Sequence, residues 1–221
     1  MLSAFGKAFK TPDLRKKIFF TLSIMALFRF GSVVPTPGVS YKNVQECLNQ
    51  VQTGGLFGLI NLFSGGALLH LSVFALGIMP YITSSIIVQL LTVVIPRFEA
   101  LKNEGQSGTA KLTQYTRYLT VGLAILQSTG LVAVARTTGR LINGCTLPII
   151  PDSSWQRIIT MIFVMTAGTA VIMWLGELIT DRGVGNGMSI LIFTSIAAGF
   201  PGNLWSIKLQ KGLFAFLFVI A

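Results

Sequence analysis

Side chains that could carry chemistry are scarce in this sequence. Its 221 residues include one histidine, His70, two cysteines, and only seven Asp and Glu residues in total. Metal sites need several such ligands at short spacing, and the sequence has no group of that kind. It also lacks a Ser-His-Asp set, a phosphate-binding loop and a dinucleotide fingerprint. We therefore expect no catalytic residues, no metal and no cofactor, and we predict that the protein is not an enzyme.

Two of the few carboxylates are close neighbours in the sequence. Glu177 and Asp181 are four residues apart, a spacing that places both on one face of a helix, and Arg182 follows them at a predicted helix end. We interpret these residues as a solvated charge cluster rather than as a site.

Charged residues of all kinds make up only 11% of the chain, whereas 52% of it is hydrophobic and its mean hydropathy is +0.72. These values exclude an ordinary soluble domain and are typical of a polytopic membrane protein. No carboxylate lies inside a predicted span, which argues against a proton-coupled transporter, because such proteins carry acidic or histidine relays there. Arg29 is the only ionisable residue inside a span, and we expect it to pair within the bundle.

Several apolar runs approach the length needed to cross a membrane, which is roughly 20 helical residues for a hydrocarbon core of about 30 Å. Five predicted spans cover residues 18–35, 73–95, 118–135, 158–179 and 188–201. The start of a sixth covers residues 212–221 and has no polar flank, so we expect the chain to be a fragment of a longer protein. The predicted fold is all-α, a helical bundle of five spans plus the start of a sixth.

Residues 56–71 form an apolar segment that is too short to cross a bilayer. The segment also holds Asn61, Ser64, two adjacent glycines and His70. Non-helical or short backbone at membrane depth is tolerated only inside protein or along a water-filled cavity. We therefore predict a short re-entrant half-helix, or plug, with an amphipathic surface helix as the alternative.

The distribution of basic residues predicts the orientation, because lysine and arginine are retained in short cytoplasmic loops. With a cytoplasmic N-terminus, most of the seventeen basic residues fall in the amphipathic segment 1–17, the loop 96–117 and the Gly-rich turn 180–187. The loop 136–157 is then exoplasmic. A net charge of +10 could also indicate nucleic acid or anionic lipid as a partner, but this topology accounts for much of it.

Bulky aliphatic side chains recur at helical spacing beside both irregular segments. Ile78 and Ile82 flank Pro80, and Met188 and Ile192 follow the glycines of the turn. Each pair is separated by four residues and so lies on one helical face. Ordinary core packing explains such spacing, and a constriction lined by aliphatic side chains is the alternative.

Three stretches resemble the SecY family, the pore subunits of the bacterial protein-conducting translocon. They are NLFSGGAL from residue 61, FALGIMPYITSSIIVQLLTVV from residue 74 and MWLGELITDRGVGNGMSILIF from residue 173, and residues 35–38 and 114–118 also fit. The resemblance covers the N-terminal half of that family. It implies two five-span halves around an hourglass pore, which passes unfolded preproteins across the bacterial inner membrane and releases membrane segments through a lateral gate.

The resemblance also implies roles for particular residues. Ile78, Ile82 and Ile192 fall on positions of an aliphatic pore ring, and Met188 falls beside it. Thr83, Ile87 and Gln89 fall on the lateral gate. The plug is implied to include Phe57, Leu59, Ile60, Asn61, Phe63, Ser64, Gly65, Gly66 and Leu68.

The partners implied by the resemblance are SecE, SecG, the SecA motor, the ribosome, an unfolded preprotein and the lipid bilayer, with a signal-recognition receptor and a membrane insertase as further candidates. Two other classes stay open. Half of a secondary transporter would also show broken helices near the midplane, and a membrane assembly factor would conduct nothing. A second five-span half in the remaining sequence would favour the translocon.

Overall fold

The computed structural model describes residues 11–50, 66–137, 147–151 and 154–198. Within these ranges the regular secondary structure is helical, apart from one isolated bridge between Pro35 and Ser72. The helices are α2 (Pro12–Val33), α3 (Tyr41–Gln50), α5 (Met79–Val94), α6 (Pro96–Asn103), α7 (Gln106–Arg136), α8 (Trp155–Arg182) and a last helix, Gly187–Ala198.

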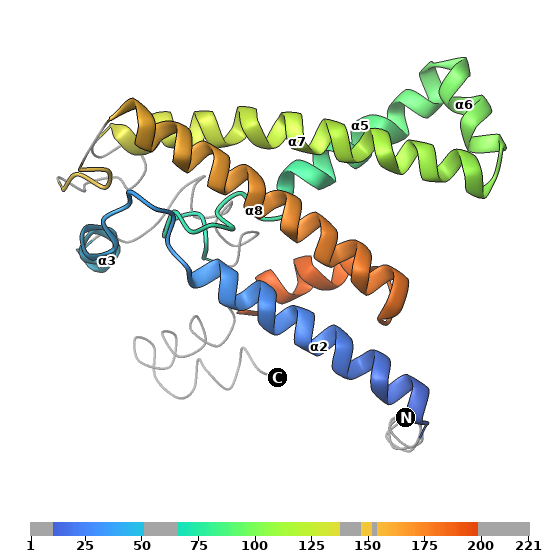
Figure 1. Cartoon of the computed structure of the whole chain (residues 1–221), viewed down its shortest axis with the longest axis horizontal. Helices are drawn as coiled ribbons and strands as arrows, with labels where there is room; N and C mark the ends of the chain where they lie inside the picture. The colour runs from blue at the N-terminus through green and yellow to red at the C-terminus, as the bar shows by residue number, and fades with distance from the viewer. Residues whose placement is uncertain (1–10, 51–65, 138–146, 152–153, 199–221) are drawn as a thin grey trace, which may run out of the picture.

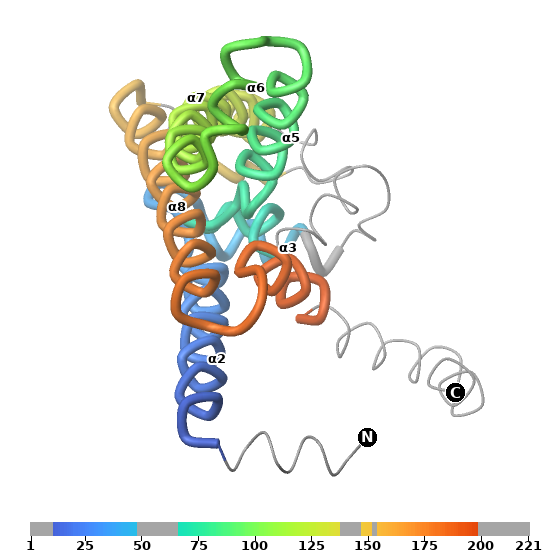
Figure 2. The backbone as a smooth tube through the Cα atoms, turned by 90° about the vertical axis from the view of Figure 1, so that its right-hand side faces the viewer, coloured from blue at the N-terminus to red at the C-terminus, as the bar shows by residue number. Residues whose placement is uncertain are grey.

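The two longest helices, α7 and α8, pack against each other along the molecule (Figure 1). Helix α5 packs on α7, and α2 packs on α8. Helix α3 and residues 147–151 lie at one end of this arrangement, whereas α6, the start of α2 and the turn after α8 lie toward the other (Figure 1). The Gly187–Ala198 helix folds back beside α8 (Figure 2).

Two described helices, α7 and α8, are long and apolar enough to cross a membrane. Helices α5 and α6 meet the same test only as a pair, and they are bent by 101° where they join. The bend has a covalent cause, because Pro96 has no N–H group to continue the helix and biases the preceding Ile95 toward the extended conformation that it adopts. The described part of the chain therefore contains two or three span-like helices.

The helices differ in extent from the predicted segments. Helix α2 begins at Pro12, so the end of segment 1–17 is continuous with the predicted span 18–35. The predicted span 73–95 is α-helical only from Met79, because the residues before it form turns in which Gly77 has a φ of 57°. Residues 66–71, predicted as the end of a half-helix, are also turns.

The apolar core divides into two clusters. One lies toward the α3 end and joins α3 to residues 68–76, 149–150 and the adjoining parts of α7 and α8. The other joins α2, the start of α5, the second half of α8 and the last helix. The second cluster contains the residues that the sequence marks as candidates for a constriction.

Candidate functional site

The four predicted ring residues come together in the second core cluster. Ile78 is the N-cap of α5 and is 2% exposed, and Ile82 lies one turn later on α5. Met188 and Ile192 come from the last helix, and they pack partly buried against the same cluster as Ile82. Two segments more than 100 residues apart thus contribute aliphatic side chains to one place.

Two glycines allow the last helix to approach α8 closely. A Cβ atom added to Gly187 would collide with the backbone carbonyl of Gly176, and one added to Gly176 would be 2.5 Å from Sδ of Met188. A larger residue at Gly187 would push the helix away from α8, whereas one at Gly176 would displace the end of the Met188 side chain. The position of Met188 therefore depends on a contact between the backbones of the two helices.

The turn between α8 and the last helix is fixed by side-chain hydrogen bonds. Oδ1 of Asn186 accepts hydrogen bonds from the N–H groups of Met188 (3.0 Å) and Ser189 (3.3 Å), which satisfies donors at the start of the helix. Oγ1 of Thr180 accepts from the N–H group of Gly187 at 2.9 Å. Oγ1 of Thr21 on α2 accepts from the N–H group of Val184 at 3.3 Å.

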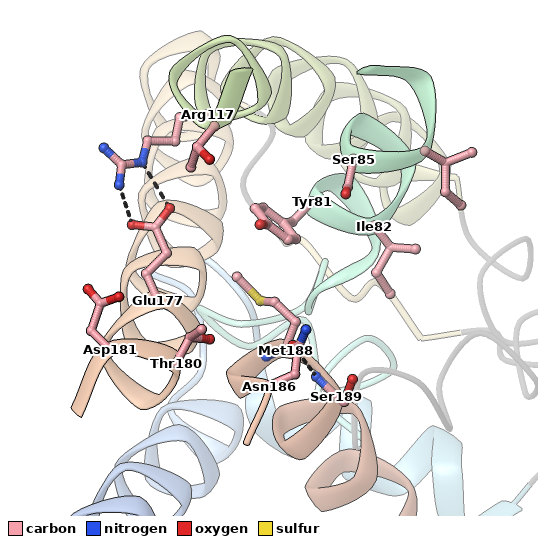
Figure 3. A pocket seen from close by; sticks show the side chains of 12 residues that line it. Tyr81, Ile82, Ser85, Arg117, Glu177, Thr180, Asp181, Asn186, Met188 and Ser189 are labelled. Carbon is pink, nitrogen blue, oxygen red and sulfur yellow. Dashed lines mark hydrogen bonds and ion pairs between the residues drawn. The ribbon is translucent and has the colours of Figure 1, made fainter. Parts of the chain in front are cut away.

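A cavity of about 430 Å³ opens beside this turn (Figure 3). Ile82, Ile86 and Met188 contribute apolar surface to it. The remaining lining is polar or charged and comes from all four surrounding elements: Tyr81, Ser85, Thr113, Arg117, Glu177, Thr180, Asp181, Asn186 and Ser189. A space with such a wall can hold water. Two of the predicted ring residues, Ile82 and Met188, border this polar cavity, whereas Ile78 is buried in the core.

An ion pair across the cavity wall joins α7 to α8. Nε of Arg117 donates to Oε1 of Glu177 at 2.8 Å, and Nη2 donates to Oε2 at 2.7 Å, so the guanidinium binds the carboxylate through two parallel hydrogen bonds (Figure 3). Nη1 also donates to Oε1 of Gln114 at 3.0 Å. The two side chains of the pair are 41% and 20% exposed.

This pair corrects the interpretation of Glu177 and Asp181 as one solvated cluster. Asp181 is exposed, but Glu177 is bound to a helix that is distant in sequence. The sequence did contain a usable signal: Arg117 and Glu177 lie near the same predicted end of two successive spans and have opposite charges. Residue spacing within a single helix could not reveal this ion pair, because its two residues lie on different helices.

The described structure reaches only part of the predicted plug. Leu68 is buried in the first core cluster, and Gly66 adopts a φ of 90°. Seven other predicted plug residues lie outside the described residues: Phe57, Leu59, Ile60, Asn61, Phe63, Ser64 and Gly65. The role of the segment stays a prediction.

The predicted gate residues all lie on α5. Oγ1 of Thr83 donates to the carbonyl of Met79 at 2.9 Å, Ile87 is half-buried and Gln89 is exposed. Arg29 lines a second cavity, of about 110 Å³, together with Tyr41 and His70. It also makes a long contact of 3.5 Å with Oγ of Ser32. Neither the gate nor the pairing of Arg29 is tested by these contacts.

The family model described as SecY matches residues 72–221 of the chain. The chain is similar to the protein translocase subunit SecY of Streptomyces coelicolor, with 68% identity over 96% of this chain and 49% of that protein. It is similar to the same subunit of Mycobacterium bovis, with 56% identity over 100% of this chain and 51% of that protein. The chain thus spans about half the length of these curated relatives.

Solved structures show the same fold at low sequence identity. The described arrangement is similar to canine Sec61 in a ribosome-channel complex from the endoplasmic reticulum, with a TM-score of 0.56 and 16% identity over 91% of this chain and 39% of that chain. A structure described as a protein-conducting channel matches with a TM-score of 0.55 and 16% identity over the same shares.

Proposed function

Because the chain belongs to the SecY family, we propose that it forms the N-terminal half of a protein-conducting channel in a bacterial inner membrane. In this proposal the channel passes unfolded preproteins and releases membrane segments sideways through a lateral gate. One observation carries the proposal: aliphatic side chains from α5 and from the last helix meet at the edge of a polar cavity.

The chemistry of such a constriction suits an unselective channel. A narrow apolar ring excludes ions by dewetting, because an ion cannot shed its water there. The same ring offers neither a fixed charge nor a pattern of hydrogen bonds, so it does not discriminate between passing sequences. Ile78, Ile82 and Ile192, with Met188 beside them, would form this half of the ring, and the polar cavity would be part of the funnel that leads to it.

The proposed topology has five spans and a cytoplasmic N-terminus. The spans would be formed by α2, α5 with the turns before it, α7, α8 and the last helix with the residues after it. The arrangement in Figure 1 supports this order, since the start of α2, α6 and the turn after α8 lie toward one end and α3 and residues 147–151 lie at the other. The basic residues at the start of α2 then lie in the cytoplasm.

Half of a ring cannot seal a pore, so the proposal needs a second half to face these residues. Thr83, Ile87 and Gln89 on α5 would border the lateral gate between the halves. SecE and SecG would be bound within the membrane, and SecA or the ribosome would deliver the preprotein from the cytoplasm. A signal-recognition receptor and a membrane insertase are further proposed partners.

The proposal is tested by ion flux through full-length channels that carry this half, reconstituted in liposomes. Ile82→Asn and Ile192→Ser place a polar side chain on the ring, so each is expected to raise resting ion flux while preprotein transport continues. Val93→Asn is the matched control, because Val93 is on the same helix as Ile82, is 79% exposed and lies outside the core cluster.

Resting flux that is unchanged in both ring variants would show that these residues are ordinary core and that the pore assignment is wrong. Equal leakage in Val93→Asn would show that a polar residue anywhere on α5 disturbs the bilayer seal, and would equally reject the ring. Saturable uptake of a small solute in place of preprotein transport would favour half of a secondary transporter.

A further inference from the structure

Met188 differs from the other three candidate ring residues, which are isoleucines, because its side chain contains a sulfur atom. It is half-buried, packs against the second core cluster with Ile82 and Ile192, and lines the polar cavity of about 430 Å³. In Figure 3 its side chain extends between Glu177 on α8 and Tyr81 on α5. The thioether thus lies where the aliphatic cluster meets a space that can hold water.

The surroundings of this sulfur atom are closed on one side and open on the other. A Cβ atom added to Gly176 would be 2.5 Å from Sδ and 2.6 Å from Cε of Met188, so the end of the side chain packs closely on the backbone of α8. The hydroxyl groups of Tyr81, Thr180 and Ser189 line the cavity that Met188 also lines. An oxygen atom added to the sulfur therefore finds room and hydrogen-bond donors in the cavity and not toward α8.

We propose that a peroxide oxidises Met188 to methionine sulfoxide and that this modification opens the constriction to ions. Sδ attacks one oxygen of hydrogen peroxide and the oxygen–oxygen bond breaks. The second oxygen leaves as hydroxide, which takes the proton from the first and becomes water. The sulfur loses two electrons and the peroxide gains them. Methionine sulfoxide reductases reverse the modification, so the site is reversible.

The modification changes the chemical character of the constriction. A thioether is apolar and a weak hydrogen-bond acceptor, whereas a sulfoxide is polar. An apolar constriction excludes ions by dewetting, and a polar group on it restores a path for water. This effect on ion flux rests on the proposed function, because it requires Met188 to border the pore. The oxidation itself requires only that the sulfur can be reached from the cavity.

Three other methionines provide internal comparisons. Met161 and Met165 have no exposed surface and belong to the first core cluster, so we expect peroxide to oxidise neither in the folded channel. Met173 is half-buried, lines a neighbouring cavity of about 420 Å³ and lies outside the second core cluster. We expect Met173 to be oxidised without an effect on ion flux.

The experiment treats the full-length channel, reconstituted in liposomes, with dilute hydrogen peroxide and measures resting ion flux and peptide masses before and after treatment. The peptide that contains Met188 is expected to gain one oxygen atom, about 16 Da, and resting flux is expected to rise several-fold. Treatment with both methionine sulfoxide reductases should reverse the two changes. The rise should be absent in Met188→Leu, which keeps an apolar side chain of similar volume without the sulfur, and should persist in Met173→Leu.

Three results would overturn the proposal. The first is a Met188 peptide that gains no oxygen under conditions that oxidise Met173. The second is a rise in flux in Met188→Leu equal to that in the unsubstituted channel, because another residue would then be the cause. The third is oxidised Met188 without a rise in flux in a channel whose Ile192→Ser variant leaks, which would refute the oxidation switch and leave the pore assignment intact. Unchanged flux in Ile82→Asn and Ile192→Ser would instead refute the proposed function.

Discussion

The ion pair between Arg117 and Glu177 is expected to stabilise the packing of α7 on α8, and its two halves are expected to contribute unequally. The informative changes are Arg117→Gln, Glu177→Gln and the double substitution. Glu177→Gln keeps the size and shape of the side chain, whereas Arg117→Gln leaves a shorter polar side chain without the guanidinium, and both remove the charge interaction and its two parallel hydrogen bonds.

The magnitude follows from the exposure of the pair. Hydrogen bonds to charged groups contribute about 1.5–3 kcal/mol, whereas fully exposed ion pairs contribute about 0.2–1 kcal/mol. Side-chain exposures of 41% for Arg117 and 20% for Glu177 place this pair between the two cases. Solvent screening lowers the upper figure, so we expect a coupling free energy of about 1–2 kcal/mol between the two positions.

The two single substitutions should lower the stability by different amounts, because the guanidinium and the carboxylate keep different contacts when the partner is removed. Without Glu177, the guanidinium still reaches solvent and keeps its bond to Oε1 of Gln114. Without Arg117, the carboxylate of Glu177 remains four-fifths buried and loses both hydrogen bonds. Arg117→Gln is therefore expected to cost about 2 kcal/mol and Glu177→Gln about 1 kcal/mol.

A double-mutant cycle on the unfolding of the purified complex in mild detergent measures these values. Asp181→Asn is the matched control, because it removes the same charge one turn later on α8 from an exposed side chain. A coupling energy near zero would refute the reasoning. The reasoning would also be refuted if Asp181→Asn lowered the free energy of unfolding as much as Glu177→Gln does. The loss would then come from the change in net charge and not from the paired geometry.

Three other changes test different parts of the structure. Gly187→Ala is expected to destabilise the complex by about 1–3 kcal/mol through overpacking against α8, whereas Gly122→Ala on α7, where an added Cβ meets nothing within 4 Å, should be neutral or slightly stabilising in the same melting assay. Single cysteines in loops 36–55, 136–157 and 202–211 should react with an impermeant reagent from outside the cell, and reaction at position 106 or 185 would contradict the topology. Excision of residues 57–69 should raise resting ion flux without stopping transport, and flux at the unmodified level would show that the segment is not a seal.

The sequence predicted the class of fold from quantities that depend on composition and local order. Low charge and long apolar runs indicated a membrane protein, and α7 and α8 contain the predicted spans 118–135 and 158–179. Spacing of four residues placed Ile78 and Ile82 on one face, as it did Met188 and Ile192. Spacing could not show that the two pairs share one cluster, because that contact depends on how α8 turns back at residues 183–186.

Other features depend on contacts between distant segments and were not predictable in this way. The late start of α5 follows from turns that are stabilised by pairing with the end of α2, including the hydrogen bond from the N–H group of Val73 to the carbonyl of Val34 at 2.9 Å. Glu177 was assigned to the wrong environment because its partner is 60 residues away. Local pattern cannot distinguish a carboxylate that faces water from one that faces another helix.

The contacts around the cavity suggest why a gate made of apolar side chains needs a stiff frame. Exclusion of ions by dewetting depends on the width of the constriction, so the ring side chains must be held at fixed separations. Met188 is positioned by the close contact of Gly176 with Gly187, by the Asn186 cap and by Thr180. Ile82 is positioned by α5, which packs on α7, and α7 is joined to α8 by the Arg117–Glu177 pair. In the proposed channel the charged and polar groups of the cavity wall thus set the spacing of the aliphatic groups, which themselves make no directional contacts.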